Sequence, residues 1–260
     1  MELALDLTLL LMLVAFVAGF IDAMAGGGGL LVIPALLAAG VPPVTALGTN
    51  KLQSTLGTGG ALLAFVAKGR IDWRRFAAPC VAALIGSGLG AFIVQRVDSS
   101  FLAAVIPLLL IAMAIYFLAA PKMSDEDRHS RVGPAGLVGV VAGIGFYDGF
   151  FGPGTGSFLT TALVALFGLG MISAIAHTKL LNFCSNLAGL VLLVIGGHVL
   201  WITGLCMAAA SIAGNQLGAH AAMRFGGKAV RPLLVLMCLG LTVKLLLDPA
   251  NPLYRLFAAG

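Results

Sequence analysis

Long apolar runs separated by short polar segments make up most of this chain. A helix of about 20 apolar residues crosses the roughly 30 Å hydrocarbon core of a bilayer. Runs near that length recur at residues 3–21, 44–67, 76–95, 101–120, 133–150, 172–195, 199–223 and 229–247, and shorter runs occupy 29–41 and 156–169. They lack the apolar–polar alternation of barrel strands, so the pattern predicts an all-α, polytopic membrane helix bundle with backbone amides hydrogen-bonded inside each helix.

Composition supports a lipid environment. Of 260 residues, 60% are apolar and 10% are charged, and the mean hydropathy is +1.08. Soluble domains contain about 25% charged residues. The first run carries Glu2 and Asp6 where a secretion signal has cations, so it is predicted to be a membrane span.

The net charge of +5 does not indicate a nucleic-acid partner, because the cations lie in loops, where membrane topology explains them. The four cysteines lie inside apolar segments without metal-ligand spacing. No metal and no cofactor are therefore predicted.

Two sequence repeats cover the chain. An offset of 128 residues aligns Trp73 with Trp201, and it also aligns Lys51 with Lys179, Gly86 with Gly214, Gly90 with Gly218 and Arg96 with Arg224. Near the start of each repeat the offset is 126 residues, which aligns Asp22 with Asp148. This self-similarity predicts a first membrane repeat at 1–120, a linker at 121–132 and a second membrane repeat at 133–260.

Loop charges predict that the two repeats are inverted. The loop at 68–75 contains Lys68, Arg70, Arg74 and Arg75, whereas the equivalent loop at 196–199 contains no lysine or arginine. Because cytoplasmic loops are enriched in cations, the two loops should lie on opposite sides of a bacterial-type inner membrane, with the linker in the cytoplasm and both termini outside. Each repeat then crosses an odd number of times, and its short run either spans or forms a re-entrant hairpin with the preceding helix.

Glycine-rich segments interrupt the first apolar run of each repeat, at 25–29 and 151–156. Interrupted helices at the junction of inverted repeats commonly form the substrate sites of transporters, and a helix that starts after glycines offers free N–H groups to an anion. The alternative is that these glycines only allow tight helix packing. The candidate substrate-binding residues here are Gly26, Gly27, Gly28, Gly29, Gly152, Gly154, Thr155 and Gly156.

Lys51 and Lys179 lie within the apolar runs, on the order of 10 Å deep at 1.5 Å per residue. Hydrogen-bonding side chains surround each lysine at helical spacing, which is how a helix would bind an oxyanion. The further candidate residues are Thr49, Asn50 and Ser54 around Lys51, and Thr178, Asn182 and Asn186 around Lys179. Alternatively, each lysine extends to the headgroups.

Asp22 and Asp148 have three interpretations: ion pairing with the lysines, capping of the helix after the glycines, or proton coupling. His177 occurs in one repeat only and is either a proton-coupling or an interhelical structural residue. The glycines at 86, 90, 214 and 218 predict close helix contact, within one chain or in a homodimer.

Several motifs together resemble the TauE/SafE family of membrane permeases over essentially the whole chain. They are the segments at 19–29 (GFIDAMAGGGG), 46–54 (ALGTNKLQS), 145–157 (GFYDGFFGPGTGS) and 178–183 (TKLLNF). The resemblance implies an inner-membrane permease for sulfite, thiosulfate or a related organosulfur anion. The residues themselves indicate a small oxyanion.

Other functions are weaker alternatives. A membrane-embedded enzyme is disfavoured because the chain has no HExxH motif, no GxSxG motif and no Gly-x-Gly-Asp partner for Tyr147 and Asp148. A permease for an organic acid or a metal ion also remains, although the two lysines argue against a cation. No P-loop is present in the sequence, so a solute or proton gradient would drive transport.

Overall fold

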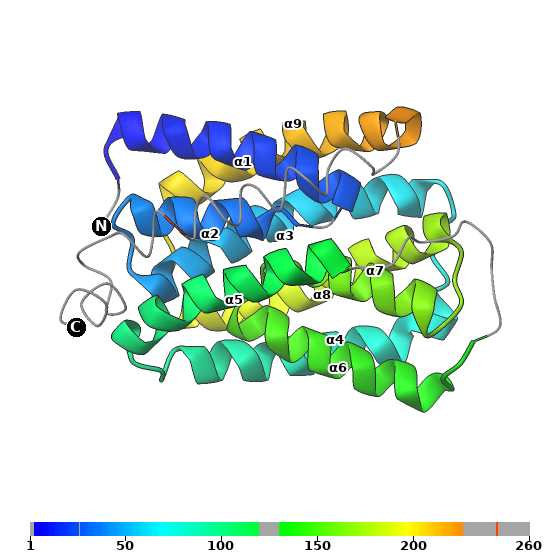
Figure 1. Cartoon of the computed structure of the whole chain (residues 1–260). Helices are drawn as coiled ribbons and strands as arrows, with labels where there is room; N and C mark the ends of the chain where they lie inside the picture. Colours follow the sequence, from blue (N-terminus) through cyan, green and yellow to red (C-terminus); the bar gives the residue numbers. More distant parts are fainter. Residues whose placement is uncertain (1–2, 26, 120–129, 226–242, 244–260) are drawn as a thin grey trace.

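The computed structural model describes residues 3–25, 27–119, 130–225 and 243. Within them the chain folds into helices joined by short loops, without strands (Figure 1). The helices are α1 (Leu5–Ala25), α2 (Gly29–Ala38), α3 (Pro43–Ala67), α4 (Trp73–Val94), α5 (Ser99–Ala119), α6 (Pro134–Phe150), α7 (Thr155–Ala165), α8 (Met171–Ile195) and α9 (Trp201–Phe225). Each predicted run up to residue 223 corresponds to one of these helices, and the run at 229–247 lies outside the described residues except for Val243.

Local sequence explains several helix boundaries. Pro43 and Pro134 stand at the first positions of α3 and α6, where a missing N–H costs nothing. The Asp72 carboxylate caps α4 by accepting a hydrogen bond from the Arg75 N–H. Gly154 precedes α7 with φ of +83°, a left-handed conformation that favours glycine. The glycine segments therefore interrupt the bundle where the sequence predicts.

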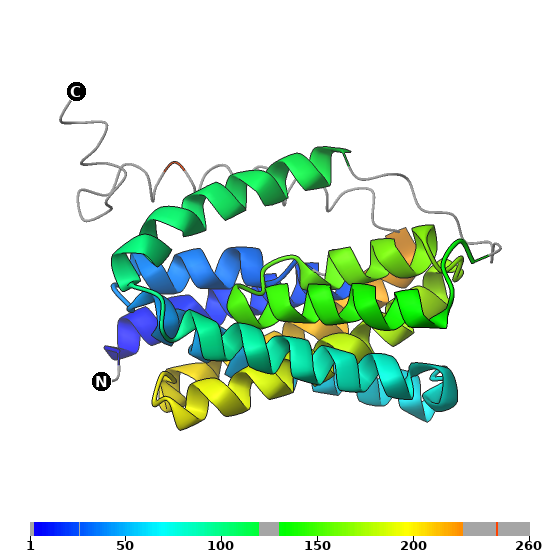
Figure 2. The ribbon, with the colours of Figure 1, turned by 90° about the horizontal axis from the view of Figure 1, so that it is seen from below.

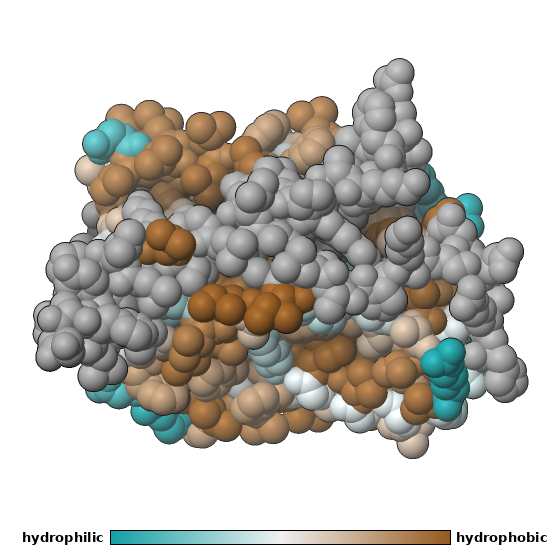
Figure 3. All heavy atoms as spheres, viewed as in Figure 1, coloured by the Kyte–Doolittle hydropathy of each residue, from teal (hydrophilic) through white to brown (hydrophobic). Residues whose placement is uncertain are grey.

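The described helices have an apolar outer surface. Leu5, Leu13, Ile85 and Ile195 expose 75%, 61%, 60% and 77% of their surface, and apolar atoms cover much of the visible face of the described residues (Figure 3). By length and composition, Leu5–Ala23, Trp73–Val94 and Met171–Ile195 can each cross a membrane. Lys51, Lys179 and Asp148, in contrast, are buried inside. The prediction of an all-α membrane bundle is confirmed.

The first helix of each repeat packs against the fourth helix of the other repeat. Gly86 and Gly90 of α4 lie directly on the backbone of α6, at Ala142 and Phe146. The equivalent glycines of α9, Gly214 and Gly218, lie on the backbone of α1 at Phe16 and Phe20. Small residues allow this close approach in membrane helices. The glycine stripes are thus used for packing within the chain.

The central helices α3 and α8 run antiparallel. The Thr49 hydroxyl, near the start of α3, accepts a hydrogen bond from the N–H of Leu200, which follows α8 (3.1 Å). Near the start of α8, His177 Nε2 accepts from the N–H of Asp72, which follows α3 (3.0 Å). In Figure 1, α2 turns back toward the end of the bundle where α1 begins, and Figure 2 shows α5 lying across one face. The Thr49 and His177 contacts therefore correspond to each other, since each joins the start of one central helix to the loop after the other.

Candidate solute-binding site

The first of two buried ion pairs joins α3 to α6. Lys51 Nζ lies 2.8 Å from Asp148 Oδ2, and the two side chains are each 2% exposed. The ammonium group also donates to Asn186 Oδ1 at 3.1 Å, and the Thr155 hydroxyl donates to Asp148 Oδ1 at 2.8 Å. Any side chain at Gly152 would crowd Lys51 Nζ, because a Cβ atom there would lie 3.3 Å away. This glycine lets the lysine reach the helix break.

The second ion pair joins α8 to α1. Lys179 Nζ lies 2.8 Å from Asp22 Oδ2 and donates to the Asp22 carbonyl oxygen at 3.1 Å. Asp22 Oδ1 accepts a weaker hydrogen bond from the N–H of Gly28, just before α2, at 3.3 Å. The Lys179 side chain is 4% exposed and that of Asp22 is 16% exposed. This pair is therefore more accessible than the first.

Each lysine pairs with the aspartate of the other repeat. The contacts exclude the interpretation in which the lysines extend to the headgroups, because at most 4% of either lysine side chain is exposed. They agree with two of the interpretations of the aspartates, since both carboxylates form ion pairs and Asp22 accepts from the N–H before α2. Proton coupling stays a prediction.

A small polar cavity adjoins the Lys179–Asp22 pair. Its lining comes from α1, α3, α8 and α9 and from the first glycine segment: Ala18, Asp22, Gly28, Gln53, Ser54, Gly57, Thr58, Asn182, Ser211 and Asn215. The volume open to the centre of a water molecule is about 20 Å³, which is room for about one water. The lining positions of α3, α8 and α9 fall near the midpoints of these 25-residue helices. The cavity is thus central to the bundle.

Two buried acceptors belong to the lining of this cavity. Gln53 Oε1 and Asn215 Oδ1 have no hydrogen-bond partner among the residues that the structure describes. Both residues are 4% exposed. Their amide nitrogens do have partners, because Gln53 Nε2 donates to Ser211 Oγ at 2.6 Å and Asn215 Nδ2 donates to the Ser211 carbonyl oxygen at 3.0 Å. Each side chain therefore leaves one oxygen available.

The cavity brings together only part of the predicted site. Asp22, Gly28, Ser54 and Asn182 line it, and Lys179 is adjacent through its ion pair with Asp22. Another group surrounds the first ion pair: Asn186, Gly152 and Thr155 contact Lys51 or Asp148. Gly26 lies outside the described residues.

The remaining predicted residues connect helices. Thr49 and His177 bind the loops after α8 and α3, and the His177 ring also stacks on Phe76 with ring centroids 3.9 Å apart. Thr178 accepts from the Thr160 hydroxyl at 3.0 Å. These contacts favour the structural interpretation of His177.

The glycine segments of the two repeats meet each other. A Cβ atom at Gly29 would lie 3.3 Å from Pro153 and 3.6 Å from the side-chain nitrogen of Asn50. Gly27 is buried, and the Gly156 carbonyl accepts from the Thr160 hydroxyl at 2.8 Å. Gly154 faces the Met113 side chain of α5. The two interruptions are therefore one continuous region of irregular backbone.

Gln53 and Ser211 were not among the predicted site residues. Gln53 stands in the segment at 46–54, two positions after Lys51. A polar amide inside an apolar helix indicates a candidate site residue, so the sequence does contain a signal for Gln53. Ser211 offered none, because a lone serine is common in membrane helices. Its role depends on how α9 packs beside α1 and α3.

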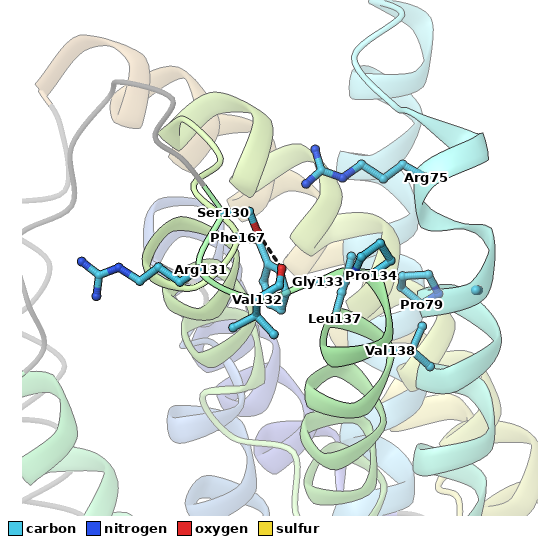
Figure 4. A pocket seen from close by; sticks show the side chains of 11 residues that line it. Arg75, Pro79, Ser130, Arg131, Val132, Gly133, Pro134, Leu137, Val138 and Phe167 are labelled. Atoms are coloured by element: carbon cyan, nitrogen blue, oxygen red, sulfur yellow. Dashed lines mark hydrogen bonds between the residues drawn. The ribbon is translucent and has the colours of Figure 1, made fainter.

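A second cavity lies at one end of the bundle, where no predicted site residue is found. Its volume is about 400 Å³, and its walls come from the starts of α4 and α6 and from Phe167. Arg75 lines one side, and the Ser130 hydroxyl donates to the Val132 carbonyl oxygen at 2.7 Å (Figure 4). Val132, Leu137 and Val138 make much of the remaining wall apolar.

An apolar exterior around buried charge pairs and a central polar cavity is the arrangement of a membrane transporter. Comparison with known proteins agrees. The chain belongs to the TauE/SafE family, because the family model described as sulfite exporter TauE/SafE matches residues 11–245. The resemblance noted from the motifs is thereby confirmed.

Relatives of similar length carry transporter names. The chain is 45% identical to the probable membrane transporter protein ORF9 of a Sinorhizobium species, over 97% of both chains. It is 44% identical to a probable membrane transporter protein of Haemophilus influenzae, over 95% of this chain and 98% of the relative. It is 42% identical to the probable membrane transporter protein YfcA of Escherichia coli K12, over 92% of this chain and 89% of the relative. No solved structure matches the chain.

Proposed function

We propose that this transporter carries a small anion, and that the anion binds at the cavity beside Lys179 and Asp22. The observation that carries the proposal is the position of this ion pair at a polar cavity near the helix midpoints. A lysine provides charge for an oxyanion, and Ser54, Thr58 and Asn182 add hydroxyl and amide groups. The solute would separate Lys179 from Asp22 or bind beside both.

Sulfite, thiosulfate or a related organosulfur anion is the proposed substrate class. The family description names sulfite export, and tetrahedral or pyramidal oxyanions of this size suit a lysine with neighbouring hydroxyl groups. The cavity has room for about one water in this conformation. The proposed mechanism therefore includes a second conformation in which the cavity is wider.

An inverted repeat gives the route between the two conformations. Support comes from the antiparallel course of α3 and α8 and from the exchange of ion-pair partners between the repeats. In the proposed inner-membrane topology the cationic loop at 68–75 faces the cytoplasm and both termini lie outside. Rocking of one repeat against the other would then open the cavity to each side in turn.

Asp22 is the proposed proton-coupling residue. Its side chain lines the cavity and is 16% exposed, whereas that of Asp148 is 2% exposed. Protonation of Asp22 would release Lys179 to the anion, and loss of the proton would restore the ion pair. This exchange would couple one proton site to one anion site.

The test is uptake of radiolabelled sulfite and thiosulfate into proteoliposomes, with and without a pH gradient. We expect the Lys179→Gln variant to lose at least about 10-fold in uptake, the size of a typical single charged contact. The control is Arg96→Gln, which removes an exposed cation at the end of α4. Folding of each variant is checked by size-exclusion chromatography.

The outcomes separate three claims. If Lys179→Gln abolishes uptake and Arg96→Gln leaves it intact, the proposed site is supported. Equal uptake by both variants contradicts the role of Lys179. No uptake of either sulfur anion by the wild type refutes the substrate class, and a panel of organic acids and divalent metal ions then tests the other permease functions.

A further inference from the structure

The two ion pairs have equivalent positions but different surroundings. Gln53 and Asn215 stand near the Lys179–Asp22 pair, in the lining of its cavity. At the offset of 128 residues their counterparts are Leu181 and Ser87. Ser87 donates its hydroxyl to the Ser185 carbonyl oxygen at 2.5 Å, and Leu181 is apolar. Two of the three buried amide oxygens without a partner among the described residues therefore belong to the lining of this cavity, and the third is that of Asn50.

The orientation of the Asn215 amide follows from its neighbour. The Ser211 main-chain carbonyl can only accept hydrogen bonds, so the Asn215 NH₂ group must face it. This leaves Asn215 Oδ1 on the opposite side, buried and without a partner in the described part of the chain. The NH₂ group of Gln53 donates to the Ser211 hydroxyl oxygen, and Gln53 Oε1 has no partner in the described part of the chain. A buried acceptor without a donor is unfavourable, so both oxygens favour a ligand that donates.

The charge of the cavity points the same way. Asp22 of the lining is ion-paired to Lys179, so an anion at the cavity would have one cation, one carboxylate and two amide groups nearby. Oxygen atoms of a fully deprotonated anion would be repelled by the carboxylate and by both amide oxygens. A hydroxyl, an acidic O–H or an ammonium group on the solute would instead satisfy them.

We propose that the site selects anions that also carry a hydrogen-bond donor, with the oxyanion held by Lys179 and the donor held by the oxygens of Gln53 and Asn215. This inference rests on the proposed function and specifies its substrate class. A protonated oxyanion or a hydroxylated sulfonate belongs to this class, and a sulfonate without a donor does not. The other use of the two oxygens is to hold one water molecule, which would give no such preference.

The experiment compares two monoanions that differ by a single hydroxyl group. Binding of 2-hydroxyethanesulfonate and of ethanesulfonate to the purified full-length protein is measured by isothermal titration calorimetry. We expect the hydroxylated anion to bind at least about 10-fold more tightly, because sites built to hydrogen-bond a hydroxyl strongly reject analogues that lack it.

The variants exchange each acceptor for the residue of the other repeat. In Gln53→Leu and Asn215→Ser we expect the preference for the hydroxylated anion to fall to about 2-fold or less. The control is Ser87→Ala, which removes a hydroxyl from the equivalent position outside the cavity and should keep the full preference. Gln53→Leu and Asn215→Ser are tested separately, so that one folding failure leaves the other variant informative.

Each outcome bears on the inference. Equal binding of the two anions by the wild type overturns it and leaves the proposed function standing, provided that sulfite is carried in proteoliposomes. A preference that survives both variants overturns it as well, and so does transport of sulfite without binding of either sulfonate. If no anion is bound or carried, the proposed function fails first.

Discussion

Lys51 Nζ lies 2.8 Å from Asp148 Oδ2, with both side chains buried, although the two residues belong to different repeats. The pair joins the first half of α3 to the end of α6 at the second glycine segment. Removing two charges from water is costly, and close pairing with added hydrogen bonds offsets that cost. Asn186 and Thr155 supply those hydrogen bonds. This pair therefore depends on all four residues being in place.

Removing only the lysine should destabilise the protein strongly. Lys51→Met leaves the Asp148 carboxylate buried without its cation, and loss of one partner of a buried pair costs about 3–5 kcal/mol. The double variant Lys51→Met with Asp148→Asn removes both charges and should lose much less. SDS-induced unfolding in mixed micelles measures both. A double variant that is as unstable as the single one would contradict the buried-charge explanation.

Glycines on one helix differ in what they contact, which gives a matched pair of variants. A Cβ atom at Gly90 would overlap the Phe146 carbonyl of α6, whereas one at Gly88 meets nothing within 4 Å. We expect Gly90→Ala to lower the free energy of unfolding by about 1–3 kcal/mol through forced helix separation. Gly88→Ala should be neutral or stabilising by up to about 1 kcal/mol, because alanine favours a helix. Equal effects would mean that α4 and α6 do not touch as described.

The helices could be predicted from the sequence because membrane spans are long and lack charge. Each of the runs within the described residues is a helix, and the junctions of α1 with α2 and of α6 with α7 fall within the predicted interruptions at 25–29 and 151–156. The 126 and 128 residue offsets also identified the paired residues, since Lys51, Lys179, Asp22 and Asp148 are all in ion pairs. The offsets show only which residues are equivalent. They do not predict that Lys51 pairs with Asp148 and Lys179 with Asp22.

The cavity could not be predicted because its lining comes from helices that are distant along the chain. Gln53 of α3 meets Ser211 and Asn215 of α9 only because glycines at 19 and 57 leave space beside them. A run of apolar residues predicts that a helix forms, but the side that each polar residue faces depends on the packing of its neighbours. Thr49 and His177 show the same effect, since both bind loops away from the cavity.

His177 should contribute to stability and leave the pH dependence of transport unchanged. Its Nε2 accepts the Asp72 N–H at the start of α4, so His177→Leu leaves that donor without a partner and should cost about 1–3 kcal/mol. His177→Gln keeps an acceptor near the same place and should recover much of the loss. Uptake by His177→Gln is then measured from pH 5.5 to 8. A profile that flattens relative to wild type would restore His177 as a proton-coupling residue.

The ends of the bundle carry different charges, which allows a direct test of the proposed topology. Arg70 and Arg131 are exposed residues at the cationic end of the bundle. Arg131 lines the same cavity as Arg75, which lies near the start of α4 and close to Arg70 in the sequence. Ser100 and His198 belong to the other end, where the loop after α8 approaches Gln95 of α4 at Gly196. If the repeats are inverted in the membrane, these two pairs of positions face opposite sides.

Cysteine labelling in whole cells measures this arrangement. In a background without the four native cysteines, we introduce Arg70→Cys, Arg131→Cys, Ser100→Cys and His198→Cys one at a time and treat the cells with a membrane-impermeant maleimide. Ser100→Cys and His198→Cys should react in intact cells, because their loops carry fewer cations and are predicted outside. The cysteines at 70 and 131 should react only after permeabilisation. Labelling of 70 and 198 from the same side would exclude the inverted topology, and with it the alternating opening of the cavity, because the equivalent loops of two inverted repeats cannot share one side.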